Sequence, residues 1–308
     1  MSELKVDEKA SVIYRQWKAP LPKAVLLLVH GLGAHSQRWN FLADFFLENN
    51  ISSYAIELRG FGETKGLKGD VENFNIYYND IRSLCGIIKK ENHDKKIFLI
   101  GESLGALIAF LITAQAQDLY FRGQKPPRRW LGGWVWPLKY SAKQGTPGFS
   151  MGGAPFSGVI LISPVFKSRL KMPALNYFKI FFSLFYNTKK QFYLPFDSKI
   201  CTRDTAYQKI MDADPREHRL ATARLLLNIA LSQIRAQYLK NRARAPILFL
   251  LSGRDELADS AASRSFFQSL KREDKAIFLY PEMRHALSIE LGKEEAFADI
   301  LKWVEKRL

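Results

Sequence analysis

A serine flanked by glycines occupies the most chemically informative position in this chain. The stretch Gly101–Gly105 reads GESLG; it follows a short apolar run, Ile97–Ile100, and precedes an apolar helical pattern. This order predicts a strand, a sharp turn with Ser103 at its apex, and a helix. The glycines would let strand and helix approach closely, and the helix N-terminus would favour negative charge developing on a carbonyl oxygen. Ser103 is therefore a candidate nucleophile for acyl transfer.

A serine nucleophile needs a histidine as base and an acid to orient that histidine. His285 lies five residues past the predicted strand Ala276–Tyr280, and Asp255 follows the predicted strand Pro246–Leu251. The loops at the carboxyl ends of parallel strands meet at one edge of the sheet. The order Ser103, Asp255, His285 therefore predicts a nucleophile–acid–base triad.

Other assignments of these groups remain open at the level of sequence. Asp255 could instead cap a helix beginning near Glu256, and Asp259 is a competing acid. His285 could be a helix-terminal histidine that bonds to backbone groups. A second GxSxG match, Gly148–Gly152, contains Ser150, but it is neither preceded by a strand pattern nor followed by a helical one. That second match is more typical of a glycine-rich loop.

Two backbone N–H groups are needed to stabilise the oxyanion that forms in acyl transfer. One would come from Leu104, directly after the nucleophile, and the other from Leu32 in the loop His30–Gly33. Gly31 and Gly33 would let this loop approach the reacting carbonyl. An ordinary strand-to-helix turn is the alternative reading of this loop.

The elements around these residues alternate between strand and helix patterns. Ser11–Ala19 is predicted to be a strand, and one option is that it forms a hairpin with the residues that precede it. Runs of aliphatic residues predict further strands, mostly buried on both faces: Lys23–His30, Ile51–Leu58, Ile97–Ile100, Gly158–Ser163, Pro246–Leu251 and Ala276–Tyr280. Helical spacing occurs in 36–50, 75–91, 266–270 and 294–308. We therefore expect an α/β protein with a mostly parallel central sheet and helices on both faces.

Two segments interrupt this alternation. Residues 1–164 and 246–308 are expected to form the core, with a basic insertion rich in Trp, Gly and Pro at about 119–155. Residues 165–245 are largely helical and are expected to form an inserted cap. Within the cap, Ala174–Asn187 is apolar except for one narrow polar stripe. This helix could be buried in the cap core, line an acyl-chain channel, or rest on lipid.

Charge and composition indicate in which cellular compartment the protein works and which classes of partner it binds. The net charge is +16, yet no acidic residue lies between Asp118 and Asp197, where twelve Lys and Arg residues occur. Two cysteines far apart, no signal-peptide pattern and no apolar run of about 18 residues favour a cytoplasmic protein. Peripheral contact with an anionic membrane, at its inner face, is one option for the basic segment. No aromatic–basic RNA-recognition motif is present, so no nucleic-acid partner is expected.

Several motifs resemble those of one enzyme family. HGLGAHSQRW (30–39), RGFGETKG (59–66), GESLGA (101–106), SGRDELAD (252–259) and PEMRHALS (281–288) occur in this order. They resemble the motifs of monoacylglycerol lipases and lysophospholipases of the α/β-hydrolase superfamily, over about 12–115 and 157–308. Phe61 and Thr64 replace the usual histidine and serine of the second motif. The segment 119–155 departs from the family pattern.

The resemblance implies an α/β-hydrolase fold and a serine hydrolase acting on esters of single long acyl chains. Its triad would be Ser103, Asp255 and His285, with Leu32 and Leu104 in the oxyanion hole, and neither a metal nor an organic cofactor. The substrate would be a small acyl ester or lysolipid. Two alternatives are a thioesterase or amidase using the same triad, and a catalytically silent protein that binds anionic lipid.

Overall fold

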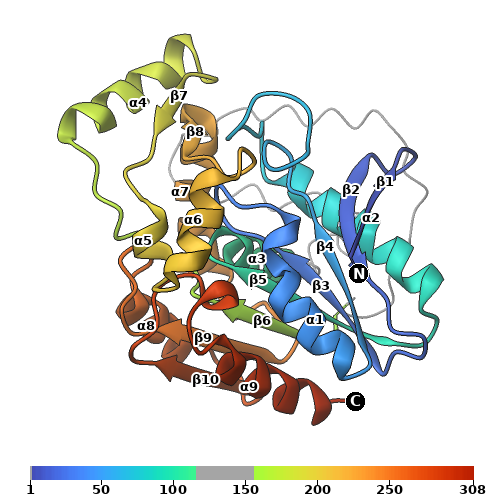
Figure 1. Ribbon diagram of the computed structural model, residues 1–308. Coiled ribbons are helices and arrows are strands. Elements are labelled where there is room, and N and C mark those ends of the chain that lie inside the picture. Colours follow the sequence, from blue (N-terminus) through green and yellow to red (C-terminus); the bar gives the residue numbers. More distant parts are fainter. Residues whose placement is uncertain (1, 116–155) are drawn as a thin grey trace, which may run out of the picture.

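An eight-stranded sheet forms the centre of the protein (Figure 1). The structure, a computed structural model, describes residues 2–115 and 156–308, so Ser150 and the predicted insertion at 119–155 lie outside it. The strand order is β1-β2-β4-β3-β5-β6-β9-β10. The bounds are β1 Glu3–Asp7, β2 Val12–Trp17, β3 Ala24–Val29, β4 Ile51–Ile56, β5 Lys96–Glu102, β6 Gly158–Ile162, β9 Ile247–Ser252 and β10 Lys275–Tyr280. Strands β4, β3, β5, β6, β9 and β10 run parallel to one another, and the β1–β2 hairpin joins them with antiparallel pairing, which confirms the expected fold class.

Alternate residues of the aliphatic strands pack against two different layers of helices. In β3, Val25, Leu27 and Val29 face one hydrophobic cluster, and Leu26 and Leu28 face the other. The first cluster includes α2 (Asn75–Glu91), α3 (Leu104–Gln115) and α8 (Ser260–Ser269), and the second includes α1 (Asn40–Glu48) and α9 (Lys293–Glu305). Both faces of the sheet are therefore covered, as a continuous apolar strand requires.

Helix α8 is longer than its sequence pattern indicated. We expected helical spacing over 266–270, whereas α8 begins at Ser260. Asp259 caps it, because its Oδ1 accepts a hydrogen bond from Ala262 N at 3.0 Å. The helix therefore begins with a turn of small residues, Ser260–Ser263, which shows no apolar periodicity.

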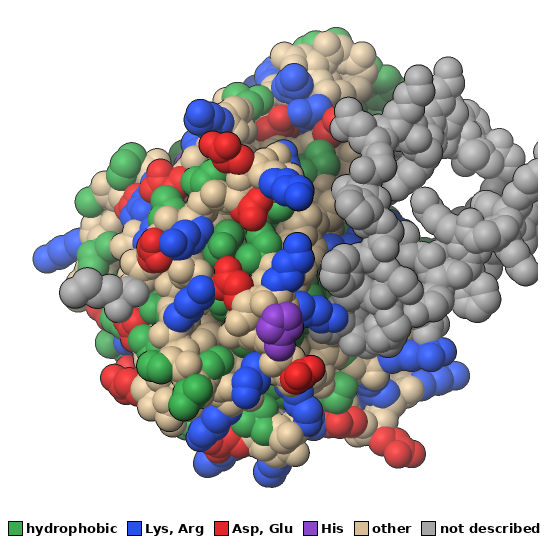
Figure 2. All heavy atoms as spheres, turned by 90° about the vertical axis from the view of Figure 1, so that its right-hand side faces the viewer, with side chains coloured by type: hydrophobic (Ala, Val, Ile, Leu, Met, Phe, Trp, Pro, Cys, Tyr) green, Lys and Arg blue, Asp and Glu red, His purple; other side chains and the backbone are tan. Residues whose placement is uncertain are grey.

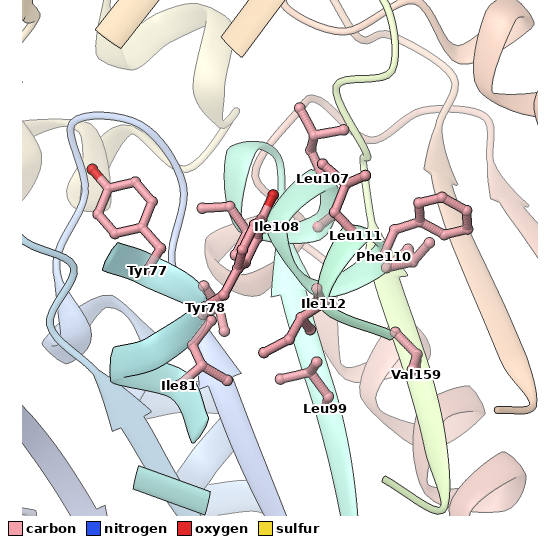
Figure 3. Close-up of a cluster of buried hydrophobic side chains, with 14 of the residues drawn as sticks. Tyr77, Tyr78, Ile81, Leu99, Leu107, Ile108, Phe110, Leu111, Ile112 and Val159 are labelled. Carbon is pink, nitrogen blue, oxygen red and sulfur yellow. The ribbon is translucent and has the colours of Figure 1, made fainter. Parts of the chain in front are cut away.

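Every residue of α3 is buried. In Figure 3 its apolar side chains, from Leu107 to Ile112, lie among Tyr78 and Ile81 of α2, Leu99 of β5 and Val159 of β6. A helix that is apolar all round is stable only where protein surrounds it. This packing fixes the helix that directly follows Ser103.

Between β6 and β9 the chain leaves the sheet and forms a second group of elements beyond the carboxyl ends of the parallel strands (Figure 1). These are α4 Ala174–Tyr186, β7 Gln191–Tyr193, α5 Ser198–Cys201, α6 Thr205–Ala213, β8 Leu220–Thr222 and α7 Ala223–Leu239. Ion pairs tie them to the core, and two examples show the geometry. Arg38 Nη2 lies 2.6 Å from Glu217 Oε2, and Arg224 Nε lies 2.7 Å from Asp70 Oδ1.

Helix α4 is not buried in the cap, so that sequence-based alternative is wrong. Ser183 is its one buried residue, and its hydroxyl donates to Lys179 O at 2.5 Å. Phe178, Phe182 and Phe185 are 63%, 57% and 70% exposed. A large part of the apolar surface of α4 therefore points away from the protein. No helix within 2–115 and 156–308 combines the length and apolar character needed to cross a membrane.

Candidate active site

The turn at Ser103 has the strained geometry that its glycines predicted. Ser103 has a φ of 57°, in the left-handed region that side chains avoid. A Cβ on Gly101 would lie 2.3 Å from Gly105 O, and a Cβ on Gly105 would lie 2.1 Å from Val29 O. Only glycine fits at either position, so the sequence around Ser103 is dictated by the close approach of β5, α3 and β3.

His285 and Asp255 form a buried hydrogen-bonded pair. His285 Nδ1 lies 2.9 Å from Asp255 Oδ1 and 2.8 Å from Oδ2. Burial alone would lower the pKa of His285, but the charge and hydrogen bond of Asp255 raise it above its ordinary value. His285 is thus oriented by an acid rather than by the backbone groups that were the alternative.

Asp255 also orders its own loop. Its Oδ1 accepts hydrogen bonds from Leu257 N at 2.9 Å and Ala258 N at 2.8 Å. No helix begins near Glu256, because α8 begins at Ser260 with Asp259 as its cap. The capping alternative for Asp255 is therefore wrong: its carboxylate orders a turn and contacts His285. The competing acid, Asp259, instead caps α8 and pairs with Lys167 at 3.1 Å.

Ser103 and His285 line one cavity of about 410 Å³, together with Leu32 and Leu104. Among the described residues, the Ser103 hydroxyl has no hydrogen bond to His285; such bonds often tighten only when substrate binds. Most of the wall residues are apolar and most belong to the inserted region, in which two helices supply a set of apolar side chains. These residues are Ile180, Phe181 and Leu184 of α4, and Leu226, Leu227, Ile229 and Ala230 of α7.

The two candidate oxyanion-hole residues, Leu32 and Leu104, belong to segments that lie beside Ser103. Leu104 is the first residue of α3, so its N–H has no partner within the helix. Gly31 brings the other loop close, because a Cβ there would lie 3.2 Å from Ser103 Cβ. His30 Nε2 accepts from Leu58 N at 3.0 Å, so its Nδ1 carries the proton and donates to Gly31 O at 2.8 Å. Burial lowers the pKa of His30 to about 3, which keeps this brace neutral.

Two charged residues of the cavity escaped the sequence analysis as site residues: Arg38 and Glu102. Arg38 binds both oxygens of Glu217, at 3.0 and 2.6 Å. Burial lowers the pKa of Arg38, but the Glu217 carboxylate and smaller contributions from other neighbours, Glu102 among them, together raise it above its ordinary value, so the guanidinium stays charged. Glu102 was visible within GESLG, yet nothing in the sequence indicated which group it contacts.

Phe61, which replaces a family histidine, has a partner in the inserted region. Its ring stacks on His218 with centroids 5.2 Å apart, and it also meets His30 edge-on. His218 N donates to Gly33 O at 3.2 Å, beside the loop that carries Leu32. The substitution at position 61 therefore joins the oxyanion-side loops to the inserted region through an apolar contact.

Within the part of the chain that the structure describes, no group of three or more His, Cys, Asp or Glu residues is arranged to hold a metal ion. Both Cys85 and Cys201 are buried and unpaired. Burial raises the pKa of the Cys201 thiol, at the cavity wall, to about 12. It is therefore a neutral wall residue and not a second nucleophile.

Comparison with known proteins identifies the family and the fold of the chain. Residues 20–123 and 148–292 match the family described as serine aminopeptidase, S33. The chain is 24% identical to the monoglyceride lipase of Mus musculus over 305 residues, covering 96% of this chain and 86% of the relative. The crystal structure of Paleococcus ferrophilus monoacylglycerol lipase aligns with a TM-score of 0.77 at 21% identity, covering 96% of this chain and 99% of that one. A soluble variant of monoglyceride lipase from Saccharomyces cerevisiae, in complex with a substrate analog, also aligns with a TM-score of 0.77, at 18% identity over 100% of this chain and 95% of that one.

Proposed function

Because the chain belongs to the serine aminopeptidase S33 family of α/β-hydrolases and resembles monoacylglycerol lipases, we propose that it hydrolyses carboxylic esters of single long acyl chains. Monoacylglycerols and lysophospholipids are the substrate types that fit this description. The observation that carries the proposal is the cavity, which is apolar along α4 and α7 and has Ser103 and His285 in its wall. Such a cavity suits one acyl chain with its ester carbonyl beside the serine.

In the proposed mechanism, His285 accepts the proton of Ser103 as Oγ attacks the ester carbonyl. The amides of Leu32 and Leu104 stabilise the oxyanion, and the tetrahedral species collapses to an acyl-serine while His285 returns the proton to the leaving alcohol. Water then repeats the sequence and releases the fatty acid. Asp255 holds the imidazole in the tautomer that accepts at Nε2, which its contact with Nδ1 supports.

Residues 165–245 act in this proposal as a cap over the core formed by 1–164 and 246–308. The apolar residues of α4 and α7 would receive the acyl chain. Each buried methylene contributes about 0.8 kcal/mol, or roughly fourfold in kcat/KM. The exposed face of α4 would contact the lipid that supplies the substrate, so the protein would associate peripherally with the membrane.

A substrate series tests the proposal directly. Acyl chains of increasing length, offered as matched monoacylglycerols, lysophospholipids, thioesters and amides, should give kcat/KM values that rise with length and favour the oxygen esters. Ser103→Ala should lower kcat by about 10⁵- to 10⁶-fold. Ser150→Ala should stay within about threefold of the wild type, because its context predicts no nucleophile.

Three results would contradict the proposal. Preference for thioester or amide at equal chain length would move the substrate class to the first alternative. Kinetics independent of chain length would remove the role given to the cavity. Lack of Ser103 labelling by a fluorophosphonate, with vesicle binding intact, would favour the silent lipid-binding alternative.

A further inference from the structure

The carboxylate of Glu102 holds the loop that carries His285. Glu102 ends β5, directly precedes Ser103 and is 3% exposed. Its Oε1 accepts from Ser288 N at 3.0 Å, and its Oε2 accepts from Ser288 Oγ at 2.9 Å. Because one carboxylate binds both the backbone and the side chain of the same residue, it fixes the position and the orientation of Ser288.

Ser288 lies three residues after His285, in the short 3-10 turn η2 (Leu287–Ile289). Glu290 holds the ends of this loop through Arg284 N at 2.8 Å and Leu291 N at 2.7 Å. Glu290 belongs to the same loop, whereas Glu102 belongs to the strand that carries Ser103. Glu102 therefore links the candidate nucleophile and the candidate base through a single side chain.

The charge of Glu102 also acts on His285. The charged groups that face His285 are Asp255, Glu102 and Arg38; the two carboxylates raise its pKa and Arg38 opposes them. When His285 accepts the Ser103 proton, the new positive charge lies in this buried surrounding, where charges interact strongly. A second carboxylate beside the imidazolium would stabilise the charged intermediate.

Glu102 has its own compensating contacts. Burial raises the pKa of its carboxyl, while Ser288 N–H and the charges of Arg38 and His285 lower it. The other titratable groups that respond to its charge are Cys201 and Tyr207, and burial raises the pKa of each to about 12. Both stay neutral, so the charges in this surrounding are those of Glu102, Asp255, His285 and the Arg38–Glu217 ion pair.

We propose that Glu102 is a positioning residue with an electrostatic role: through Ser288 it holds His285 toward Ser103, and its negative charge stabilises the imidazolium formed when the Ser103 proton moves to His285. This inference rests on the proposed function, because it takes His285 as the base. Glu102 donates no proton and forms no bond to substrate in this role.

Glu102→Gln separates charge from geometry. The amide oxygen can accept from Ser288 N and the amide nitrogen can donate to Ser288 Oγ, so both hydrogen bonds to Ser288 can form while the charge is lost. The pKa of His285 should fall by roughly one pH unit, measured by NMR of protein labelled with ¹³C-histidine. The acid limb of Ser103 labelling by a fluorophosphonate should move to lower pH by the same amount. The plateau kcat should fall about tenfold with KM unchanged, since the imidazolium is less stabilised.

Further variants test the hydrogen bonds between Glu102 and Ser288 separately from the charge. Ser288→Ala removes the hydroxyl bond but keeps the carboxylate, so kcat should fall a few-fold with the pKa of His285 unchanged. Glu102→Leu removes both contributions and should lower kcat by about 100-fold. Glu282→Gln is the matched control. It also removes a carboxylate from this loop, but the Glu282 side chain is 63% exposed, so water screens its charge. That control should leave the titration of His285 unchanged.

An unchanged titration of His285 in Glu102→Gln, with kcat within twofold of the wild type, would overturn the electrostatic role. A rate for Glu102→Leu equal to that of Glu102→Gln would overturn the positioning role. The NMR titration needs no turnover. If the wild-type protein hydrolysed no ester, the proposed function would be refuted. The effect of Glu102 on the pKa of His285 could still be measured by NMR.

Discussion

The carboxylate of Asp255 serves two sets of neighbours, and this allows a clean test of its role as the orienting acid. In Asp255→Asn the amide oxygen can still accept from Leu257 N and Ala258 N, which Asp255 Oδ1 does at 2.9 and 2.8 Å. The amide nitrogen would then face His285 Nδ1 and favour the wrong tautomer. We expect kcat to fall about 10⁴-fold while the melting temperature changes little. A loss of folding, seen by circular dichroism, would show that the loop and not the tautomer decides the effect.

The protonation of His285 sets the expected pH dependence. Only neutral imidazole can accept the Ser103 proton, and Asp255 favours the charged form. As pH rises, kcat/KM should therefore increase through an apparent pKa above the ordinary value of about 6.5. The measurement is initial rates on a soluble short ester, in buffers of constant ionic strength. A chelator should leave the profile unchanged; activity lost with chelator and restored by zinc would contradict a metal-free mechanism.

At the scale of elements, the packing of β5, α3 and β3 decides whether Ser103 can occupy its turn. Gly105→Ala would place a methyl group 2.1 Å from the backbone oxygen of Val29, which cannot move without separating helix and strand. We expect a loss of about 3 kcal/mol or more in the free energy of unfolding, and a melting temperature lower by about 10 °C. Differential scanning calorimetry would measure both.

A second glycine provides the matched control for this prediction. Gly86 lies inside α2, where an added Cβ would meet nothing within 4 Å. Gly86→Ala should stabilise the helix by about 0.5–1 kcal/mol. Equal effects of the two substitutions would show that close approach at position 105 is not what selects glycine there.

At the scale of the whole molecule, the proposed contact with lipid would use the exposed apolar side chains and basic charges around α4. Phe178, Phe182 and Phe185 point outward, and Lys171, Lys179 and Lys189 are exposed near them. On the face in Figure 2, on the side of the molecule away from α4 in Figure 1, charges of both signs are interspersed with hydrophobic groups. The surface around α4 combines apolar and cationic groups, as contact with anionic lipid requires.

Not every basic residue of this region is available for docking. Lys167 pairs with Asp259 at 3.1 Å, and Arg169 donates to Asp255 O at 2.9 Å. These two side chains anchor the start of the inserted region to the loop of the candidate acid. The charge effect on docking is therefore expected from the lysines beyond them.

Reversing Lys171, Lys179 and Lys189 to Glu should weaken binding to anionic vesicles by about tenfold or more, since each basic group near such a surface contributes about 1 kcal/mol at most. Hydrolysis of long-chain substrate in those vesicles should slow in parallel, while a short soluble ester should be cleaved as before. Vesicle sedimentation measures the first effect, and high salt should reproduce it with the wild type. The control reverses Lys90, Lys302 and Lys306, three exposed lysines on α2, α9 and the chain end. Equal binding by both triple variants would assign no specific role to the α4 surface.

The sequence by itself determined the parallel α/β sheet and the positions of the candidate catalytic residues along it. Most of the aliphatic runs form strands that are covered on both faces, whereas the run in β10 forms a partly exposed edge strand. The glycines at 101 and 105 are explained by the close approach of strand and helix. The parallel arrangement then required the loops with Ser103, Asp255 and His285 to share one edge of the sheet. These inferences depend on local patterns and on one general rule of topology, which a sequence contains.

Tertiary structure alone decided which distant groups meet. Glu102 and Ser288 are 186 residues apart, and Arg38 and Glu217 are 179 apart, and no local pattern links the members of either pair. The same holds for α4: its apolar pattern fits a buried helix as well as an exposed one, because amphipathic periodicity does not state what covers the apolar face. Contacts between loops of high sequence separation are fixed by the packing of the whole chain, and this packing built the cavity wall and the support around His285.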